Sequence, residues 1–229
     1  MKKIVIFFAV LSGLLLTASC YVRIDESKII EKGYDGTRSM RTDSLPAFKG
    51  IQLNGSMDVL YHPTKGAPRA EVWAPDPMLP RMKCEVDDAG ILQIYLEDTG
   101  FSVFQGELFV EVYGGELESA HVKGSGDMEI ECLTGDLLQA SVAGSGDLRV
   151  MKLSGNRVDA SLAGSGDMSL FGIACQDLSV RVAGSGDVTV KGKAGKASLA
   201  VSGSGDIHAG QLSCENVSQS VSGSGDIER

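Results

Sequence analysis

Residues 142–150 read VAGSGDLRV, and the Gly-Ser-Gly-Asp at the centre of this stretch occurs six times in the second half of the chain. The six copies begin at Gly124, Gly144, Gly164, Gly184, Gly203 and Gly223, at intervals of 20, 20, 20, 19 and 20 residues. The return of one motif at one phase is typical of a coil in which each turn stacks on the last. The repeat predicts a parallel β-solenoid with one turn, or rung, per 20 residues, and disfavours an antiparallel meander.

Hydrophobic residues flank each Gly-Ser-Gly-Asp with a period of two. Two positions before the first Gly stand Val122, Val142, Leu162, Val182, Val201 and Val221. Four positions after it stand Met128, Leu148, Met168, Val188, Ile207 and Ile227, and six after it Ile130, Val150, Leu170, Val190, Ala209 and Arg229. Alternation on both sides of the turn predicts one strand entering and another leaving, with these residues as inward ladders.

A second corner is expected eleven residues after the first Gly of each copy. The residues there are Gly135, Gly155, Cys175, Gly195 and Cys214. Cys175 and Cys214 lie two rungs apart, about 9.6 Å, which is too far for a disulfide. Neither a CxxC pair nor a Cys/His set with zinc spacing is present, so the interpretation of Cys84, Cys132, Cys175 and Cys214 is burial as small hydrophobic residues.

The same periodicity extends toward the N-terminus in weaker form. Counting from position 104 places Leu108 and Val110 on inward positions and Gly115 on the second corner, and residues 51–59 are a degenerate copy. Residues 83–96 read as strand, turn, strand. The predicted organisation is a signal peptide at 1–19, a tether at 20–45, a hairpin-rich β cap at 46–103 and a β-solenoid at 104–229.

The N-terminal segment has the features of an export signal. Lys2 and Lys3 precede an apolar run at 4–16, and residues 16–20 read LTASC, which resembles a bacterial lipobox. Cys20 is the predicted lipidation site, and the lipid would be the contact with the membrane. An ordinary cleaved signal and an uncleaved anchor are the alternatives, although the run is shorter than a membrane-spanning helix needs.

Composition excludes several classes of protein. The chain has 29 Gly among 229 residues, few aromatic residues, and a formal charge of -9 from 30 acidic and 21 basic side chains. This charge argues against nucleic-acid binding and disfavours acidic ligands, because no basic surplus is present. The scarcity of aromatic residues fits a narrow aliphatic lumen.

The Gly-Ser-Gly-Asp copies have three interpretations. A phosphate loop would need a following helix, and a calcium β-roll has a nine-residue period instead. The favoured interpretation is structural, with Ser and Asp bonding the amides of their own turn. The weak cation or ligand ladder would consist of Asp127, Asp147, Asp167, Asp187, Asp206 and Asp226. The structural turns would use Gly124, Gly126, Gly144, Gly146, Gly164, Gly166, Gly184, Gly186, Gly203, Gly205, Gly223 and Gly225.

Catalysis has little support in the sequence. His121 and His208 fall at different phases, the serines have no phased His partner, and identical carboxylates do not separate into acid and base. We therefore expect no enzymatic activity, no catalytic residue, no metal and no cofactor.

The lipobox, the stretches FKGI (48–51) and GILQI (90–94), and the repeats together resemble the auto-transporter adhesin head domain family, also called the head GIN domain, over about residues 45–229. The resemblance implies a right-handed β-helix, a lipid-anchored or secreted protein of a Gram-negative envelope, and no catalytic residue. The expected function is adhesion or envelope structure, at the cell surface or facing the periplasm, with a glycan or protein ligand. The alternatives are cation or glycan binding by the Asp ladder and self-association through the C-terminal rung.

Overall fold

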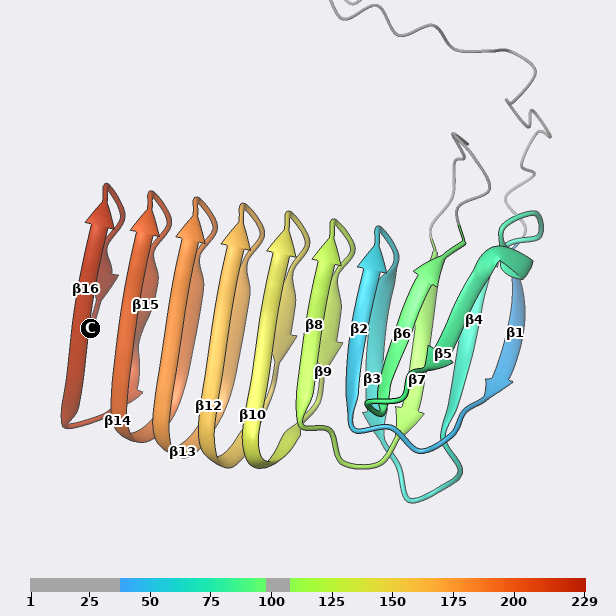
Figure 1. The fold of residues 1–229 in the computed structure, drawn as a ribbon, viewed down its shortest axis with the longest axis horizontal. Coiled ribbons are helices and arrows are strands. Elements are labelled where there is room, and N and C mark those ends of the chain that lie inside the picture. The colour runs from blue at the N-terminus through green and yellow to red at the C-terminus, as the bar shows by residue number, and fades with distance from the viewer. Residues whose placement is uncertain (1–37, 98–107) are drawn as a thin grey trace, which may run out of the picture.

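The computed structural model describes residues 38–97 and 108–229. They form a row of stacked strands with no helix long and apolar enough to cross a membrane (Figure 1). The predicted signal peptide, Cys20 and the first part of the tether lie outside the described residues. The all-β solenoid predicted from the repeat is confirmed.

Each Gly-Ser-Gly-Asp turn joins two faces of the solenoid. The first face contains β8 (Ser119–Gly124), β10 (Leu133–Gly144), β12 (Leu153–Gly164) and β16 (Asn216–Gly223). The second face contains β9 (Met128–Ile130), β11 (Leu148–Val150), β15 (Ile207–Ser213) and β17 (Ile227–Glu228). The longer strands β13 (Met168–Gly184) and β14 (Val188–Gly203) begin on the second face and end on the first. Successive rungs pair in parallel, and the first Gly of each copy is paired with the first Gly of the next.

The inward ladders are buried as predicted through the fifth Gly-Ser-Gly-Asp rung. Val122, Leu162 and Val201 are at most 3% exposed, whereas Val221 in the last described rung is 46% exposed. Two further ladders, not predicted, complete the core of the first face. Their buried members are Leu138, Val158, Leu178 and Ala197, and Ala120, Ala140, Ala160, Val180 and Leu199. The interior is aliphatic along these rungs, because two sheets close together leave little room for rings.

A degenerate rung precedes the first Gly-Ser-Gly-Asp, as the sequence predicts. It consists of β2 (Gly50–Gly55) and β3 (Asp58–Pro63), which pair with β8 and β9. Gly55 pairs with Gly124 and has a φ of 138°, close to the 131° of Gly124. The solenoid therefore has a seventh stacked turn, Gly-Ser-Met-Asp.

In the next rung toward the N-terminus, the observed pairing differs from the register that the sequence predicts for residues 104–115. β6 (Ile91–Leu96) pairs with β2, and β7 (Phe109–Gly114) pairs with β3, so the β2–β3 rung lies between this rung and the first Gly-Ser-Gly-Asp rung. Val110 pairs with Val59, which pairs with Met128, so Val110 and not Leu108 occupies the Met128 position. The offset is two residues, which keeps the same residues inward, and Leu108 is also buried.

The N-terminal end is closed by short antiparallel strands. β5 (Met82–Val86) and β6 form the predicted hairpin, while β4 (Arg69–Pro75) pairs with β7, and the 3-10 turn η2 (Leu79–Arg81) leads from β4 to β5. β1 (Arg38–Ser44) pairs with β4 and lies within the segment that the sequence assigns to the tether. The Arg41 guanidinium donates to the carbonyls of Leu79 and Met82, so β1 is tied to the start of β5.

Two aromatic side chains occupy the interior of this end. Phe48 and Tyr61 are buried with ring centroids 6.4 Å apart in an edge-to-face arrangement. The aliphatic lumen expected from composition therefore holds for the repeats but not for the degenerate rung.

One interval between Gly-Ser-Gly-Asp copies, from Gly184 to Gly203, has 19 residues instead of 20, and the strand pairing shows where the residue is missing. β13 has two residues between Leu170 and Ile173, whereas β14 has only Lys191 between the paired positions Val190 and Gly192. In β15 two residues, Gly210 and Gln211, again occupy the equivalent place before Leu212, which pairs with Gly192. The missing residue thus lies on the side of the rung away from the Gly-Ser-Gly-Asp turns.

Candidate functional site

The Asp side chains of the turns connect successive rungs by a series of hydrogen bonds, which is called the Asp relay below. Oδ1 of Asp127 accepts a hydrogen bond from the backbone N–H of Asp147 at 2.9 Å, and Oδ1 of Asp147 accepts from Asp167 at 2.8 Å. The relay starts at Asp58 and continues through Asp187, Asp206 and Asp226. The sequence placed these bonds within each turn. The structure places them between turns, because the 20-residue period aligns each carboxylate with the next amide.

This relay gives the aspartates a structural use. One oxygen of each carboxylate through Asp206 is engaged by the following rung, and charge-assisted bonds of this kind offset repulsion between stacked charges. Within the two described ranges, no group of three or more His, Cys, Asp or Glu is placed to hold a metal ion.

The histidines lie apart, yet one of them has a serine partner. His121 Nδ1 is 2.7 Å from Ser141 Oγ, since the two residues occupy the same position in consecutive rungs. This pair is not predicted from the sequence, although the 20-residue interval between 121 and 141 signals it. Burial, followed by the positive charge of Lys123, lowers the pKa of His121. No carboxylate orients this imidazole in the described residues, so the pair lacks the third member of a nucleophilic triad.

The four cysteines of the described chain are free thiols. Burial raises the pKa of Cys84 to about 12 and that of Cys175 to about 11. Thiols of this kind are poor nucleophiles at neutral pH. All four cysteines are partly exposed rather than buried as predicted, and Cys84, Cys175 and Cys214 pack against the core.

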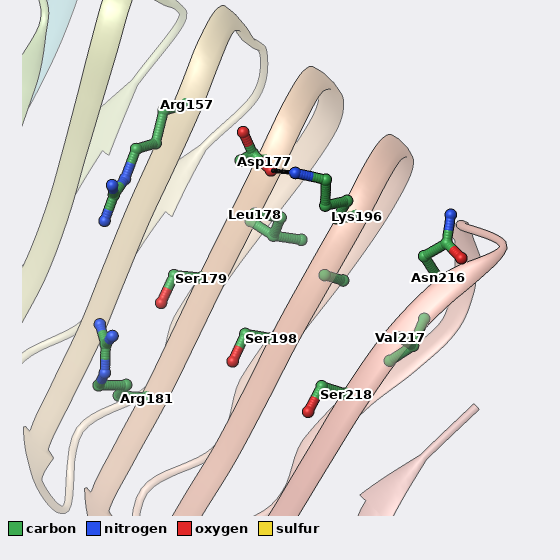
Figure 2. A pocket seen from close by; sticks show the side chains of 11 residues that line it. Arg157, Asp177, Leu178, Ser179, Arg181, Lys196, Ser198, Asn216, Val217 and Ser218 are labelled. Carbon is green, nitrogen blue, oxygen red and sulfur yellow. Dashed lines mark ion pairs between the residues drawn. The ribbon is translucent and has the colours of Figure 1, made fainter.

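A shallow hollow of about 720 Å³ lies on the outer surface of the first face (Figure 2). It crosses β12, β13, β14 and β16, whose parallel register aligns outward side chains from rung to rung. The polar residues that line it are Arg157, Asp177, Ser179, Arg181, Lys196, Ser198, Asn216 and Ser218. Ser179 pairs with Ser198, and Ser198 with Ser218, so three hydroxyls form one row across the hollow.

The hollow is locally basic. Lys196 Nζ lies 3.1 Å from Asp177 Oδ1, and Arg157 Nε lies 3.0 Å from Asp159 Oδ1. Arg181 is exposed and makes no ion pair or hydrogen bond within the described part of the chain. Ser179 Oγ is buried and has no hydrogen-bond partner among the described residues. Arg157 and Lys196 are each paired with a carboxylate, so Arg181 is the lining cation left without a partner among the described residues, and it makes the hollow suitable for an anionic, hydrogen-bonding ligand.

The predicted site residues and this hollow are different parts of the molecule. The Asp ladder lies along the turns, whereas the hollow lies on the flat first face. The polar lining residues occupy outward positions three, five and seven before the first Gly of each copy, but their side chains vary between rungs and form no obvious motif. Net charge also pointed away from acidic ligands, because it averages over the whole chain.

The family profile described as "Putative auto-transporter adhesin, head GIN domain" matches residues 47–228. The chain belongs to this family. The predicted membership is thereby confirmed, and it transfers no catalytic or binding residue to the chain.

Solved structures have the same fold at low sequence identity. A "putative adhesin" from Parabacteroides distasonis ATCC 8503 is 23% identical, with a TM-score of 0.73 over 85% of this chain and 82% of that one. A "putative adhesin" from Bacteroides fragilis NCTC 9343 is 20% identical, with a TM-score of 0.70 over 85% and 98%. A "Putative lipid binding protein" from Parabacteroides distasonis ATCC 8503 is 22% identical, with a TM-score of 0.63 over 85% and 97%. No curated protein matches the sequence.

Proposed function

We propose that this chain is a lipid-anchored, non-enzymatic binding protein of the bacterial cell envelope that acts as an adhesin through the hollow on its first face. The observation that carries the proposal is that β13 places two groups without partners in this hollow, the Arg181 guanidinium and the buried Ser179 hydroxyl. Both groups can donate hydrogen bonds, and neither has a partner among the described residues.

The ligand that suits these donors is a glycan with carboxylate or sulfate groups. A guanidinium binds such groups in a bidentate manner, and the row of serine hydroxyls offers bonds to sugar hydroxyls. The rungs repeat along the first face, so an extended chain can cross several of them. Adhesin names among the family and the solved relatives support this kind of role.

Membrane attachment is proposed from the sequence. The LTASC lipobox favours acylation of Cys20, which would hold the protein at the outer membrane of a Gram-negative bacterium, at the surface or facing the periplasm. Palmitate labelling of the wild type and of Cys20→Ala tests the anchor. Protease treatment of intact cells then tests surface exposure, since a periplasmic protein is protected.

A glycan array with the purified chain tests the ligand. We expect binding to acidic glycans that Arg181→Gln weakens at least tenfold, while Arg149→Gln on the second face, an identical change of charge, has little effect. Vesicles of phosphatidylglycerol form a comparison arm, because one solved relative is named a lipid binding protein. Equal loss in both variants would show general charge attraction and contradict the proposed site.

Self-association is a second candidate, favoured by the last described rung. Among the described strands β16 pairs only with β14, and Val221 is 46% exposed at an inward position. An unpaired strand with exposed apolar side chains can accept another strand. Sedimentation over a hundredfold range of concentration tests this role, and a constant monomer mass would exclude it.

A further inference from the structure

Aromatic rings gather on the outer surface of the second face near the N-terminal end. β4 contributes Trp73 and β7 contributes Phe109 and Tyr113, at outward positions that alternate with the buried Val72, Val110 and Val112. Trp73 pairs with Phe109 across the two strands, with ring centroids 5.8 Å apart. Aromatic residues at a surface are typical of interfaces.

A hollow of about 320 Å³ is lined by one of these rings, Phe109. Its apolar side is formed by Phe109 and Leu60. Its charged residues are Asp58, Asp127, Glu129, Asp147 and Arg149. Four carboxylates therefore face one guanidinium. Oδ1 of Asp58, Asp127 and Asp147 serves the relay between turns, which leaves the second oxygen of each, and Glu129, for other partners.

Elsewhere on the same face, cationic side chains of the protein already lie against aromatic rings. The Arg69 guanidinium lies over the Tyr113 ring, 3.7 Å from its centroid, and its Nε is 3.0 Å from Glu71 Oε1. Lys191 Nζ lies 5.1 Å from the centroid of Phe171. Each of these rings is thus matched with a cation from the chain itself. Among the described residues, no cation lies over Phe109 or Trp73, although carboxylates are adjacent.

We propose that this hollow binds an arginine or lysine side chain from an extended basic segment of a partner protein. The cation lies beside Phe109, as Arg69 lies over Tyr113, and the carboxylates of Asp58, Asp127 and Glu129 neutralise it. Cation–π attraction and the negative charge of the hollow act in the same direction. An extended segment whose alternate side chains point toward the surface can lie across these strands. This inference does not depend on the glycan site of the first face.

The sole Trp of the chain provides the readout, because Trp73 contacts Phe109. The probe is acetyl-Ser-Arg-Ser-Arg-Ser-amide, and its control is the same peptide with citrulline, which keeps the shape of arginine and removes the charge. We expect the arginine peptide to change the fluorescence of Trp73 saturably, and the citrulline peptide to require at least tenfold higher concentration.

Variants locate the site. Glu129→Gln and Phe109→Leu should each weaken binding about fivefold or more, while Glu118→Gln, the same loss of charge at an exposed position away from the hollow, should change it less than twofold. Glu129 is exposed, so its replacement leaves the fold intact. Equal binding of the citrulline peptide, equal weakening by Glu118→Gln, or displacement of the peptide by a neutral oligosaccharide would each overturn the proposal.

Discussion

The two edges of the solenoid are built in opposite ways. Along the turn edge, the same four residues recur six times, the backbones of the glycines lie against one another, and the Asp relay joins the rungs. Along the opposite corner, the equivalent residues are Gly135, Gly155, Cys175, Gly195 and Cys214, and one rung is a residue shorter on that side. The Gly-Ser-Gly-Asp edge therefore sets the register between successive rungs, while the opposite corner tolerates differences in length and residue type.

A one-residue insertion should give the largest difference between the edges. Inserting Ala between Ser165 and Gly166 moves one turn out of line with both neighbours, and we expect a loss of about 4 kcal/mol or more in the free energy of unfolding. Inserting Ala between Lys191 and Gly192 restores a 20-residue rung and should change it by less than about 1 kcal/mol. Urea denaturation followed by circular dichroism measures both, and equal losses would contradict the proposed division of roles.

Glycine replacement should give the next largest effect. Gly164 has a φ of 136°, and a Cβ added there would overlap the carbonyl oxygen of Gly144. Gly164→Ala should therefore cost about 3 kcal/mol, from backbone strain and separation of two rungs. Gly115→Ala is the matched control, because a Cβ there meets nothing within 4 Å. A small effect at Gly164 would mean that the turn edge can yield.

Removing one member of the Asp relay should have a smaller effect. Asp167→Ala leaves the N–H of Asp187 without its acceptor, at a cost of about 1 kcal/mol for an exposed bond. Asp167→Asn keeps an acceptor oxygen and should lose less, and Asp136→Ala at the opposite corner should be nearly neutral. Thermal unfolding measures all three.

Thermal unfolding of the wild type also tests whether the aspartates of the turns bind a cation. A rise of several degrees in the melting temperature with millimolar calcium, but not with magnesium, would mean that the aspartates bind a cation in addition to the amides.

The smallest expected effect concerns pH. His121 on the first face has a folded pKa below its ordinary value of about 6.5, so the unfolded chain binds the proton more readily. Well above pH 6.5 neither state binds the proton, and His121 has no effect on the free energy of unfolding. As the pH drops through 6.5 toward the folded pKa, the unfolded chain takes up the proton first and the free energy of unfolding falls. His121→Gln should flatten the stability profile between pH 7 and pH 5. His208→Gln, which changes an exposed histidine beside Glu228, serves as the control, and an unchanged profile in His121→Gln would contradict the assignment.

The sequence predicted the parts of this protein that depend on local repetition. The period, the inward ladders from Val122 to Val201, the hairpin at 83–96 and the degenerate copy at 51–59 all follow from residue type and spacing. The order of the N-terminal rungs did not, because the β2–β3 rung is placed between β7 and β9 by pairing between strands far apart in the chain. The two-residue offset at Val110 has the same origin, since a shift of two preserves the inward face.

The two hollows show the same limit at the level of function. Ser179 and Arg181 lie on β13 and Ser198 on β14, and Phe109 and Glu129 likewise belong to different rungs, so neither set forms a motif along the chain. By itself, the sequence determined that the chain coils, how long each coil is and which residues fill it, because these depend on side-chain period and on turns that glycine permits. Only the tertiary structure decided which outward side chains meet, because stacking brings together residues about 20 or more positions apart, and their combined charge differs from the charge of the whole chain.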